Sequence, residues 1–331
     1  MTVLPRMPIG GQGLTGPVLG LGCMALSVYY GGDTAAADPE RVIGAALDAG
    51  VTLLDTADAY GWGENERVVG RAIAGRRDEV VLSTKFGRAH PDRAERDVTV
   101  GRPEYVARAC EESLRRLDVD HIDVYIYHRV DPTVPVEDTV GALAALVDAS
   151  KVRFIGLSEV GPETVRRAHA VHPLSLVQNE FSLLTREPER TLLPVLRELG
   201  ITLVAYSPLH RGLLAGHVRS AADLADGDWR GTSPRFQGGN LRANLALVER
   251  LRPIAARYDL SLAQLALGWV MATEALPLQG ATTVGQLREN VAAANVTLPP
   301  EVITQLDRAM PVGAAAGERA DPGYLRHVLA R

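Results

Sequence analysis

A buried strand is predicted at Val80-Val81-Leu82-Ser83-Thr84-Lys85, where an apolar, β-branched run ends in a lysine. The chain contains 35 lysine and arginine residues, of which only Lys85 and Lys151 are lysine. Arginine serves well at solvated positions, so a lysine retained at the end of a buried strand calls for a chemical reason. A compact ammonium changes its pKa readily on burial, which a guanidinium does not. We therefore expect Lys85 to be catalytic.

Similar apolar runs recur along the chain and alternate with amphipathic stretches. They are apolar throughout, as expected for parallel strands buried on both faces. The eight predicted strands are 18–22, 52–55, 80–85, 122–127, 152–157, 176–180, 202–206 and 276–278. Predicted helices between them include 39–48, 65–73, 103–117, 137–149, 163–170 and 191–199.

These repeated units predict the fold. Eight strand–helix units without a break in composition favour a single domain over residues 1–331, folded as a closed (β/α)₈ TIM barrel. An open, doubly wound sheet is the alternative. Prolines and glycines at 5–17 predict a β-hairpin that caps one barrel end. The long polar loop 216–240, after the seventh strand, is of a length typical of functional lids.

The glycines at the N-terminus require a separate interpretation. Gly11-Gln12-Gly13-Leu14-Thr15-Gly16 fits the dinucleotide pattern G-x-G-x-x-G. No clear strand precedes it, however, and Pro17 interrupts any helix that would follow, so the structural context of that motif is missing. We therefore predict a hairpin turn here.

Composition limits the possible partners. A net charge of −5, without a basic tail, argues against nucleic acid. No signal peptide or membrane-spanning run is apparent. Two cysteines, Cys23 and Cys110, do not make a disulfide framework. No Cys/His cluster has zinc spacing, so no metal is assigned. We expect a soluble, cytoplasmic protein; its oligomeric state stays open.

Four polar residues mark the predicted strand ends: Asp55, Tyr60, Lys85 and His128. Alone, each has an ordinary explanation, such as a capping carboxylate or a hydrogen-bonded core histidine. In a barrel, however, all four would meet at the carboxyl ends of the strands, where barrel active sites lie.

Their chemistry is complementary. A tyrosine hydroxyl titrates near pH 10 in water, and an adjacent ammonium lowers that pKa by stabilising the phenolate. Lys85 would supply the charge, Asp55 would keep Lys85 protonated, and His128 would donate to a carbonyl oxygen. The set predicts an acid that protonates an oxygen, with a hydride donor still to be supplied.

Three segments resemble the aldo-keto reductase family, and the resemblance extends over nearly the whole chain. They are Asp55-Thr56-Ala57-Asp58-Ala59-Tyr60-Gly61-Trp62-Gly63-Glu64-Asn65-Glu66, Leu82-Ser83-Thr84-Lys85 and Ile122-Asp123-Val124-Tyr125-Ile126-Tyr127-His128. The resemblance implies a (β/α)₈ fold, a catalytic tetrad of Asp55, Tyr60, Lys85 and His128, and a nicotinamide cofactor bound without a Rossmann motif.

The resemblance also implies a set of cofactor contacts. Ser158 and Gln178 match residues that hold the nicotinamide carboxamide, Tyr206 matches the aromatic that stacks on the ring, and Glu159 stands where many members have asparagine. The implied cofactor-binding residues are Gly22, Cys23, Met24, Asp55, Ser158, Gln178, Tyr206, Ser207, Leu209, Gly212, Leu213, Gly280, Thr282, Gln286, Glu289 and Asn290.

One departure concerns the 2′-phosphate. Many family members place lysine and arginine there, whereas this chain has Thr282 and Gln286. The branch resembling potassium-channel β subunits carries similar neutral residues. Helix N-terminal amides still bind phosphate, so NADPH is expected, with NADH also accepted because charge-assisted bonds are lost. Arg288 would compensate, unless it faces solvent.

The leading hypothesis is an NAD(P)H-dependent reductase of aldehydes or ketones. A cofactor-binding regulatory or sensor subunit with slow turnover is the alternative, and a Schiff-base lyase using Lys85 is a third. Aromatic and arginine residues on the same loops predict a pocket for aromatic or apolar carbonyl substrates, although ordinary loop packing would also explain them. They are Tyr29, Tyr30, Trp62, Phe86, Arg129, Trp229 and Phe236.

Overall fold

Successive side chains of the strands pack on opposite sides of the sheet. The computed structural model describes residues 4–27, 37–88 and 99–320. In β4 (Leu53–Asp55), Leu53 belongs to the cluster inside the barrel and Leu54 to the cluster beneath the helices. Because both sides are covered by protein, the strands are apolar throughout.

Eight parallel strands form the barrel. Besides β4 they are β3 (Gly20–Gly22), β5 (Val81–Phe86), β6 (Ile122–Tyr127), β7 (Val152–Ser158), β8 (Leu176–Glu180), β9 (Thr202–Tyr206) and β10 (Leu276–Gln279). They close in the order β10-β3-β4-β5-β6-β7-β8-β9. The predicted closed barrel is confirmed, and the open-sheet alternative is wrong. Pairing of Asp55 with Ser83 and of Lys85 with Ile126 brings three strand ends side by side.

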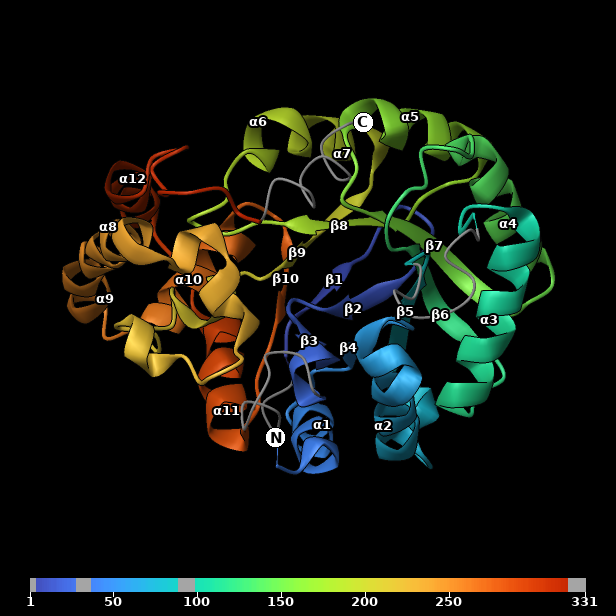
Figure 1. The fold of residues 1–331 in the computed structure, drawn as a ribbon, viewed down its shortest axis with the longest axis horizontal. Helices are drawn as coiled ribbons and strands as arrows, with labels where there is room; N and C mark the ends of the chain where they lie inside the picture. The colour runs from blue at the N-terminus through green and yellow to red at the C-terminus, as the bar shows by residue number, and fades with distance from the viewer. Residues whose placement is uncertain (1–3, 28–36, 89–98, 321–331) are drawn as a thin grey trace.

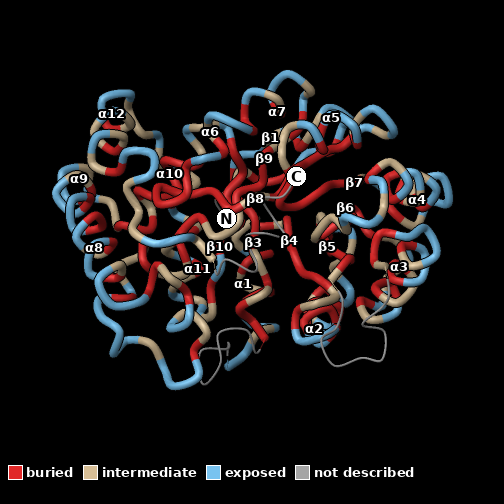
Figure 2. Tube along the Cα trace, turned by 45° about the horizontal axis from the view of Figure 1, so that its top comes forward, coloured by how far each residue is buried: buried red, intermediate tan, exposed pale blue. Residues whose placement is uncertain are grey.

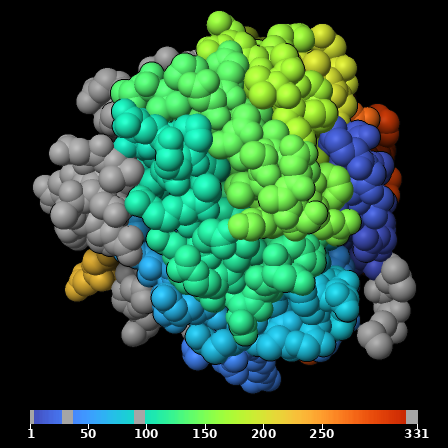
Figure 3. Space-filling model, turned by 90° about the vertical axis from the view of Figure 1, so that its right-hand side faces the viewer, coloured from blue at the N-terminus to red at the C-terminus, as the bar shows by residue number. Residues whose placement is uncertain are grey.

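The helices form an outer layer around the strands (Figure 1). Figure 2 shows that the outer sides of the helices are exposed and that the strands inside are buried. In the view of Figure 3, the middle of the chain forms a continuous outer surface. They are α1 (Pro39–Asp48), α2 (Glu64–Ile73), α3 (Pro103–Leu117), α4 (Val136–Asp148), α5 (Pro162–Val171), α6 (Pro188–Thr191), α7 (Leu193–Leu199), α8 (Gly238–Glu249), α9 (Arg252–Arg257), α10 (Leu262–Ala272), α11 (Val284–Ala292) and α12 (Pro300–Ala309). Of the helix predicted at 191–199, residues 193–199 form α7, whereas Thr191 ends the separate helix α6, because Pro194 has no N–H to continue α6.

The N-terminal hairpin closes one barrel end. Its strands are β1 (Arg6–Pro8) and β2 (Thr15–Pro17), paired antiparallel. Between them, Ile9 is fully buried and packs with the interior side chains of the barrel. At Gly10, which has a φ of +73°, a Cβ would lie 2.6 Å from the Ser175 backbone. The glycine-rich segment is therefore a hairpin turn, as predicted.

The polar segment after β9 is built from short turns. Within 216–240 it contains three 3-10 turns, Ala221–Asp223, Trp229–Thr232 and Pro234–Phe236, and α8 follows at Gly238, so the irregular segment ends earlier than the predicted loop. Within the described ranges, no helix is both long and apolar enough to cross a membrane.

Candidate active site

The strand ends bring the four predicted residues together. Asp55 ends β4, Lys85 lies near the end of β5, and His128 directly follows β6. Tyr60 begins the 3-10 turn Tyr60–Gly63 after β4. All four are buried, and Lys85 is entirely so. The carboxyl ends of adjacent parallel strands thus concentrate a charged pair, a phenol and an imidazole at one point.

The Lys85 ammonium makes three contacts. Its Nζ donates to the hydroxyl of Tyr60 at 3.1 Å, to the carbonyl oxygen of Thr56 at 2.7 Å, and to the Asp55 carboxylate. These use all three of its donors. Burial alone lowers the pKa of Lys85, but the charge of Asp55 and the phenol of Tyr60 outweigh it, so that the pKa is raised. Lys85 is therefore held as an ammonium.

Asp55 is fixed by groups other than Lys85. Its Oδ1 accepts a hydrogen bond from Ser83 Oγ at 2.9 Å and another from Gln178 Nε2 at 3.0 Å. Both carboxylate oxygens therefore have donors, as a buried charge requires. Gln178, which the resemblance implied as a cofactor contact, also orients Asp55.

The His128 imidazole is neutral. Its ring meets that of Tyr60 edge-on, with 5.8 Å between centroids. Burial, together with the cations Arg129 and Lys85, holds the pKa of His128 well below its ordinary value. Its Nδ1 is buried and has no hydrogen-bond partner in the described part of the chain. A neutral imidazole carries one N–H donor and one acceptor, and His128 itself lines the cavity beside Tyr60.

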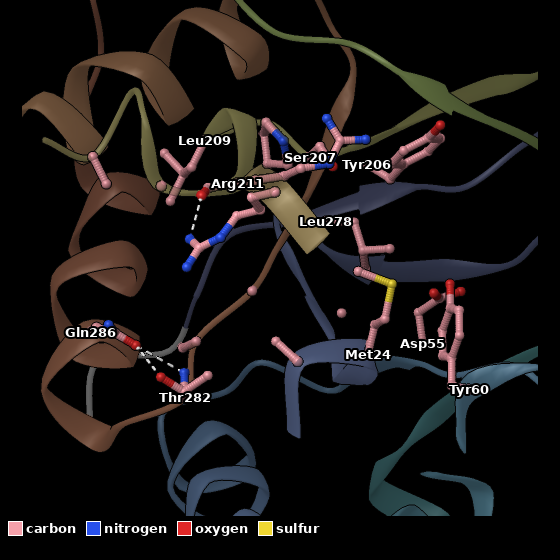
Figure 4. Close-up of a pocket in the computed structure, with 18 of the residues that line it drawn as sticks. Met24, Asp55, Tyr60, Tyr206, Ser207, Leu209, Arg211, Leu278, Thr282 and Gln286 are labelled. Carbon is pink, nitrogen blue, oxygen red and sulfur yellow. Dashed lines mark hydrogen bonds between the residues drawn. The ribbon is translucent and has the colours of Figure 1, made fainter. Parts of the chain in front are cut away.

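A long cavity of about 890 Å³ opens beside these residues. Asp55 and Tyr60 lie at one end, and Thr282 and Gln286 lie at the other (Figure 4). The predicted cofactor residues that line it are Gly22, Met24, Asp55, Ser158, Gln178, Tyr206, Ser207, Leu209, Gly212, Gly280, Thr282, Gln286 and Asn290. Cys23, Leu213 and Glu289 do not; Cys23 and Leu213 are fully buried in the core.

The loop after β9 is strained. Ser207, His210 and Arg211 all have positive φ values, between 45° and 55°, followed by Gly212 at 98°. Such conformations are costly for non-glycine residues and cluster at ligand sites. Successive turns of this kind orient backbone N–H groups toward anions, which suits a loop beside a pyrophosphate.

The cavity-lining residues of α11 and of the segment before it are neutral and bonded to one another. Gln286 Oε1 accepts from the backbone N of Thr282 at 2.8 Å and from its Oγ1 at 3.0 Å. Thr283 caps α11 through the backbone N of Gln286. Asn290 donates to Gln279 at 2.7 Å. Gln286 therefore keeps its amide N–H groups as the donors for a ligand.

Arg288, the arginine expected near the α11 end of the cavity, is not the arginine that lines it. Arg288 is exposed and does not line the cavity. Arg41, in the first turn of α1, does line it, and α1 packs against α11. Sequence reasoning missed Arg41, because nothing in the local sequence of α1 relates it to a segment 240 residues away. Only the closure of the barrel between β10 and β3 brings the two helices together.

The predicted pocket wall is only partly correct. Arg129 and Trp229 line the cavity, and Arg129 Nη1 donates to Ser158 Oγ at 3.0 Å. Trp62, Phe86 and Phe236 do not line it. Phe86 follows Lys85 and so points to the helix side, where it stacks on Tyr125 and Tyr127; Phe236 is buried against His210. Tyr29 and Tyr30 lie outside the described residues.

Glu159 forms an ion pair that sequence reasoning also missed. Its Oε2 binds Arg319 Nη2, and its Oε1 accepts the backbone N–H of Glu180 at 2.8 Å. Arg319 lines the cavity, whereas Glu159 does not. Glu180, itself buried, also pairs with Arg211 at 3.0 Å.

Comparisons with known proteins agree with this geometry. The sequence pattern of the Aldo/keto reductase family matches residues 18–311. A glycerol dehydrogenase from Gluconobacter oxydans is similar at 29% identity, with a TM-score of 0.84 and coverage of 96% of this chain and 98% of that one. An aldo-keto reductase from Bacillus halodurans has 26% identity, a TM-score of 0.77 and coverage of 95% and 98%. A thermostable aldo-keto reductase in complex with the inhibitor epalrestat has 27% identity, a TM-score of 0.74 and coverage of 92% and 100%.

Proposed function

This chain belongs to the aldo/keto reductase family, and we propose that it reduces an aldehyde or ketone with NADPH, using Tyr60 as the general acid. Members of the family are oxidoreductases that act on carbonyl and CH–OH groups, in general with NAD(P)H. The identity of the acid, the choice between the two cofactors and the setting in the cytoplasm are our proposals.

The cavity fits a dinucleotide. It is long enough to join the tetrad to the N-terminus of α11, and it is lined by donors at both ends. Ser158, Gln178 and Tyr206 would hold the nicotinamide end, and the strained loop 207–212 would follow the pyrophosphate. Thr282, Gln286 and Asn290 would hold the adenosine end. When bound, the reduced cofactor supplies a hydride.

The observation that carries the proposal is the 3.1 Å hydrogen bond from Lys85 Nζ to the Tyr60 hydroxyl. Because Lys85 donates in this bond, the phenol keeps its own proton available for a substrate oxygen. As that proton leaves, the adjacent ammonium stabilises the phenolate electrostatically. Asp55 keeps the ammonium in place throughout.

His128 has a supporting role in the proposal. As a neutral imidazole packed edge-on against Tyr60, it offers one N–H to the carbonyl oxygen of a substrate. That bond would orient the oxygen toward the phenol before proton transfer. A protonated imidazole would compete with Tyr60 as the acid, and the lowered pKa of His128 disfavours that state.

The geometry favours this activity over the alternatives. A Schiff-base lyase needs a neutral amine, whereas the three contacts and raised pKa of Lys85 favour an ammonium. A sensor with slow turnover would not require the hydrogen-bonded set of Asp55, Lys85 and Tyr60.

Turnover with a panel of aldehydes and ketones tests the proposal. We expect carbonyl-dependent oxidation of NADPH, followed at the absorbance of the reduced nicotinamide, and slower oxidation of NADH. Tight NADPH binding without oxidation by any carbonyl would instead support the sensor. Failure to bind either cofactor would refute both functions.

A further inference from the structure

Residues 314–320 form a C-terminal strap that lies beyond the family match, which ends at residue 311. Asn244 fastens the strap twice: its Oδ1 accepts from the backbone N of Ala316 at 2.8 Å, and its Nδ2 donates to the carbonyl oxygen of Ala316 at 2.9 Å. Arg235 Nε donates to the carbonyl oxygen of Gly317 at 3.2 Å. Asn244 is fully buried, so these bonds belong to a built interface.

A tight turn at Gly317 directs the strap toward the barrel. Its φ is +81°, and a Cβ there would lie 2.6 Å from Asn240 Nδ2 and 3.0 Å from the carbonyl oxygen of Pro234. Only glycine tolerates both conditions. The residues that follow, Arg319 and Ala320, both line the cavity.

Two carboxylates hold the Arg319 guanidinium. Glu159 Oε2 binds its Nη2, and Glu180 Oε2 lies 3.7 Å from its Nη1. The Arg319 side chain is 14% exposed, while both glutamates are 1% exposed. Since Glu159 also accepts the backbone N–H of Glu180, both of its oxygens are occupied. Glu159 does not line the cavity, so Arg319 is the group of this pair presented there.

The surroundings indicate what Arg319 binds. Glu159 directly follows Ser158, which lines the same cavity as Arg319, Gln178 and Tyr206. Because Glu159 and Glu180 offset the charge of Arg319, a neutral acceptor oxygen suits this guanidinium better than an anion. The guanidinium keeps N–H donors that the two carboxylates do not use.

We infer that Arg319 is a cofactor-binding residue that donates to the carboxamide oxygen of the nicotinamide, and that Glu159 is the positioning residue that orients Arg319. The inference rests on the proposed cofactor function. This chain has Glu159 where many family members have asparagine. Arg319, from the strap, would make the cofactor contact that is lost with that asparagine.

Binding of two ligands tests the inference. NADP⁺ carries the carboxamide, and 2′-phospho-ADP-ribose is the same nucleotide without the nicotinamide. We expect Arg319→Met to weaken NADP⁺ binding, measured by calorimetry, roughly tenfold to a hundredfold, the range for losing a hydrogen bond from a charged donor. Binding of 2′-phospho-ADP-ribose should stay unchanged. Arg288→Met, which alters an exposed arginine outside the cavity, is the matched control and should change neither.

Two further variants separate this contact from a merely structural role. Arg319→Lys keeps the charge but not the planar fork, so NADP⁺ binding should fall between those of the wild type and Arg319→Met. Glu159→Gln should weaken NADP⁺ selectively, as Arg319→Met does. Equal loss of both ligands, or no loss of either, would overturn the inference. Absence of NADP⁺ binding in the wild type would instead refute the proposed function.

Discussion

The two ends of the cavity hold their polar groups differently. At the tetrad end, Asp55 and Lys85 are buried charges, and each polar side-chain atom of these two residues has a protein partner. At the α11 end, Thr282 and Gln286 are neutral, half-buried, and bonded chiefly to each other. A buried ion pair broken at one partner is strongly destabilising, whereas neutral, half-exposed groups tolerate exchange. Substitutions should therefore affect catalysis steeply at the first end and only tune cofactor affinity at the second.

Lys85→Arg should have the largest effect. A guanidinium cannot reproduce the contacts of an ammonium with Asp55, Thr56 O and Tyr60, so we expect kcat to fall on the order of 10²–10⁴-fold. NADPH binding, measured by quenching of tryptophan fluorescence, should be retained. Lys151→Arg is the matched control, because Lys151 is the other lysine and pairs with Glu111 at the surface. Near-normal turnover by Lys85→Arg would show that the tetrad end of the cavity tolerates substitution as well as the α11 end.

Asp58→Asn tests whether the buried carboxyl group of Asp58 destabilises the folded protein. Burial, with Glu66 nearby, raises the pKa of Asp58 to about 8. Its Oδ1 is buried without a hydrogen-bond partner among residues 4–27, 37–88 and 99–320. Between the ordinary pKa and this value the folded state holds a proton that the unfolded chain has released, so stability falls as pH rises through that window.

The asparagine variant should lose this pH dependence. We expect its free energy of unfolding in urea to exceed that of the wild type by about 1–3 kcal/mol at pH 8, with a smaller difference at pH 5. A difference of the same size at both pH values would show that Asp58 is ionised in the folded protein.

Gln286→Arg probes the neutral end by adding charge. One charge-assisted bond in place of a neutral one should tighten NADPH about tenfold while leaving NADH nearly unchanged. Both dissociation constants follow from fluorescence titration. Equal changes for the two cofactors would mean that Gln286 does not face the 2′-phosphate.

Arg41→Ala should have the smallest effect. Arg41 is exposed, so its contribution to phosphate binding is screened, and we expect NADPH affinity to fall at most about fivefold. NADH affinity should not change, and neither cofactor should respond to Arg288→Ala. A similar loss for both cofactors would place the role of Arg41 elsewhere than at the 2′-phosphate.

The sequence predicted the site residues best where a polar residue type coincided with the end of a predicted strand. Asp55, Lys85 and His128 could be predicted as neighbours because adjacent parallel strands end at one rim. Phe86 was expected in the pocket wall, although it follows Lys85 and strand alternation turns it outward. That error was avoidable from the sequence alone.

Other contacts could not have been predicted. Glu159 and Arg319 are 160 residues apart, and only the folded strap brings them together. Arg41 likewise reaches the cavity because α1 packs against α11. Such contacts depend on the closure of the barrel and on loop conformation, neither of which leaves a periodic pattern.

Tyr60→Phe tests most directly whether the phenol of Tyr60 is the acid. The substitution removes one hydroxyl and leaves Lys85 with its contacts to Asp55 and Thr56. We predict that reduction of the best carbonyl substrate, measured in a single turnover with bound NADPH, is abolished while NADPH binding persists. A single-turnover rate close to that of the wild type would show that another group donates the proton.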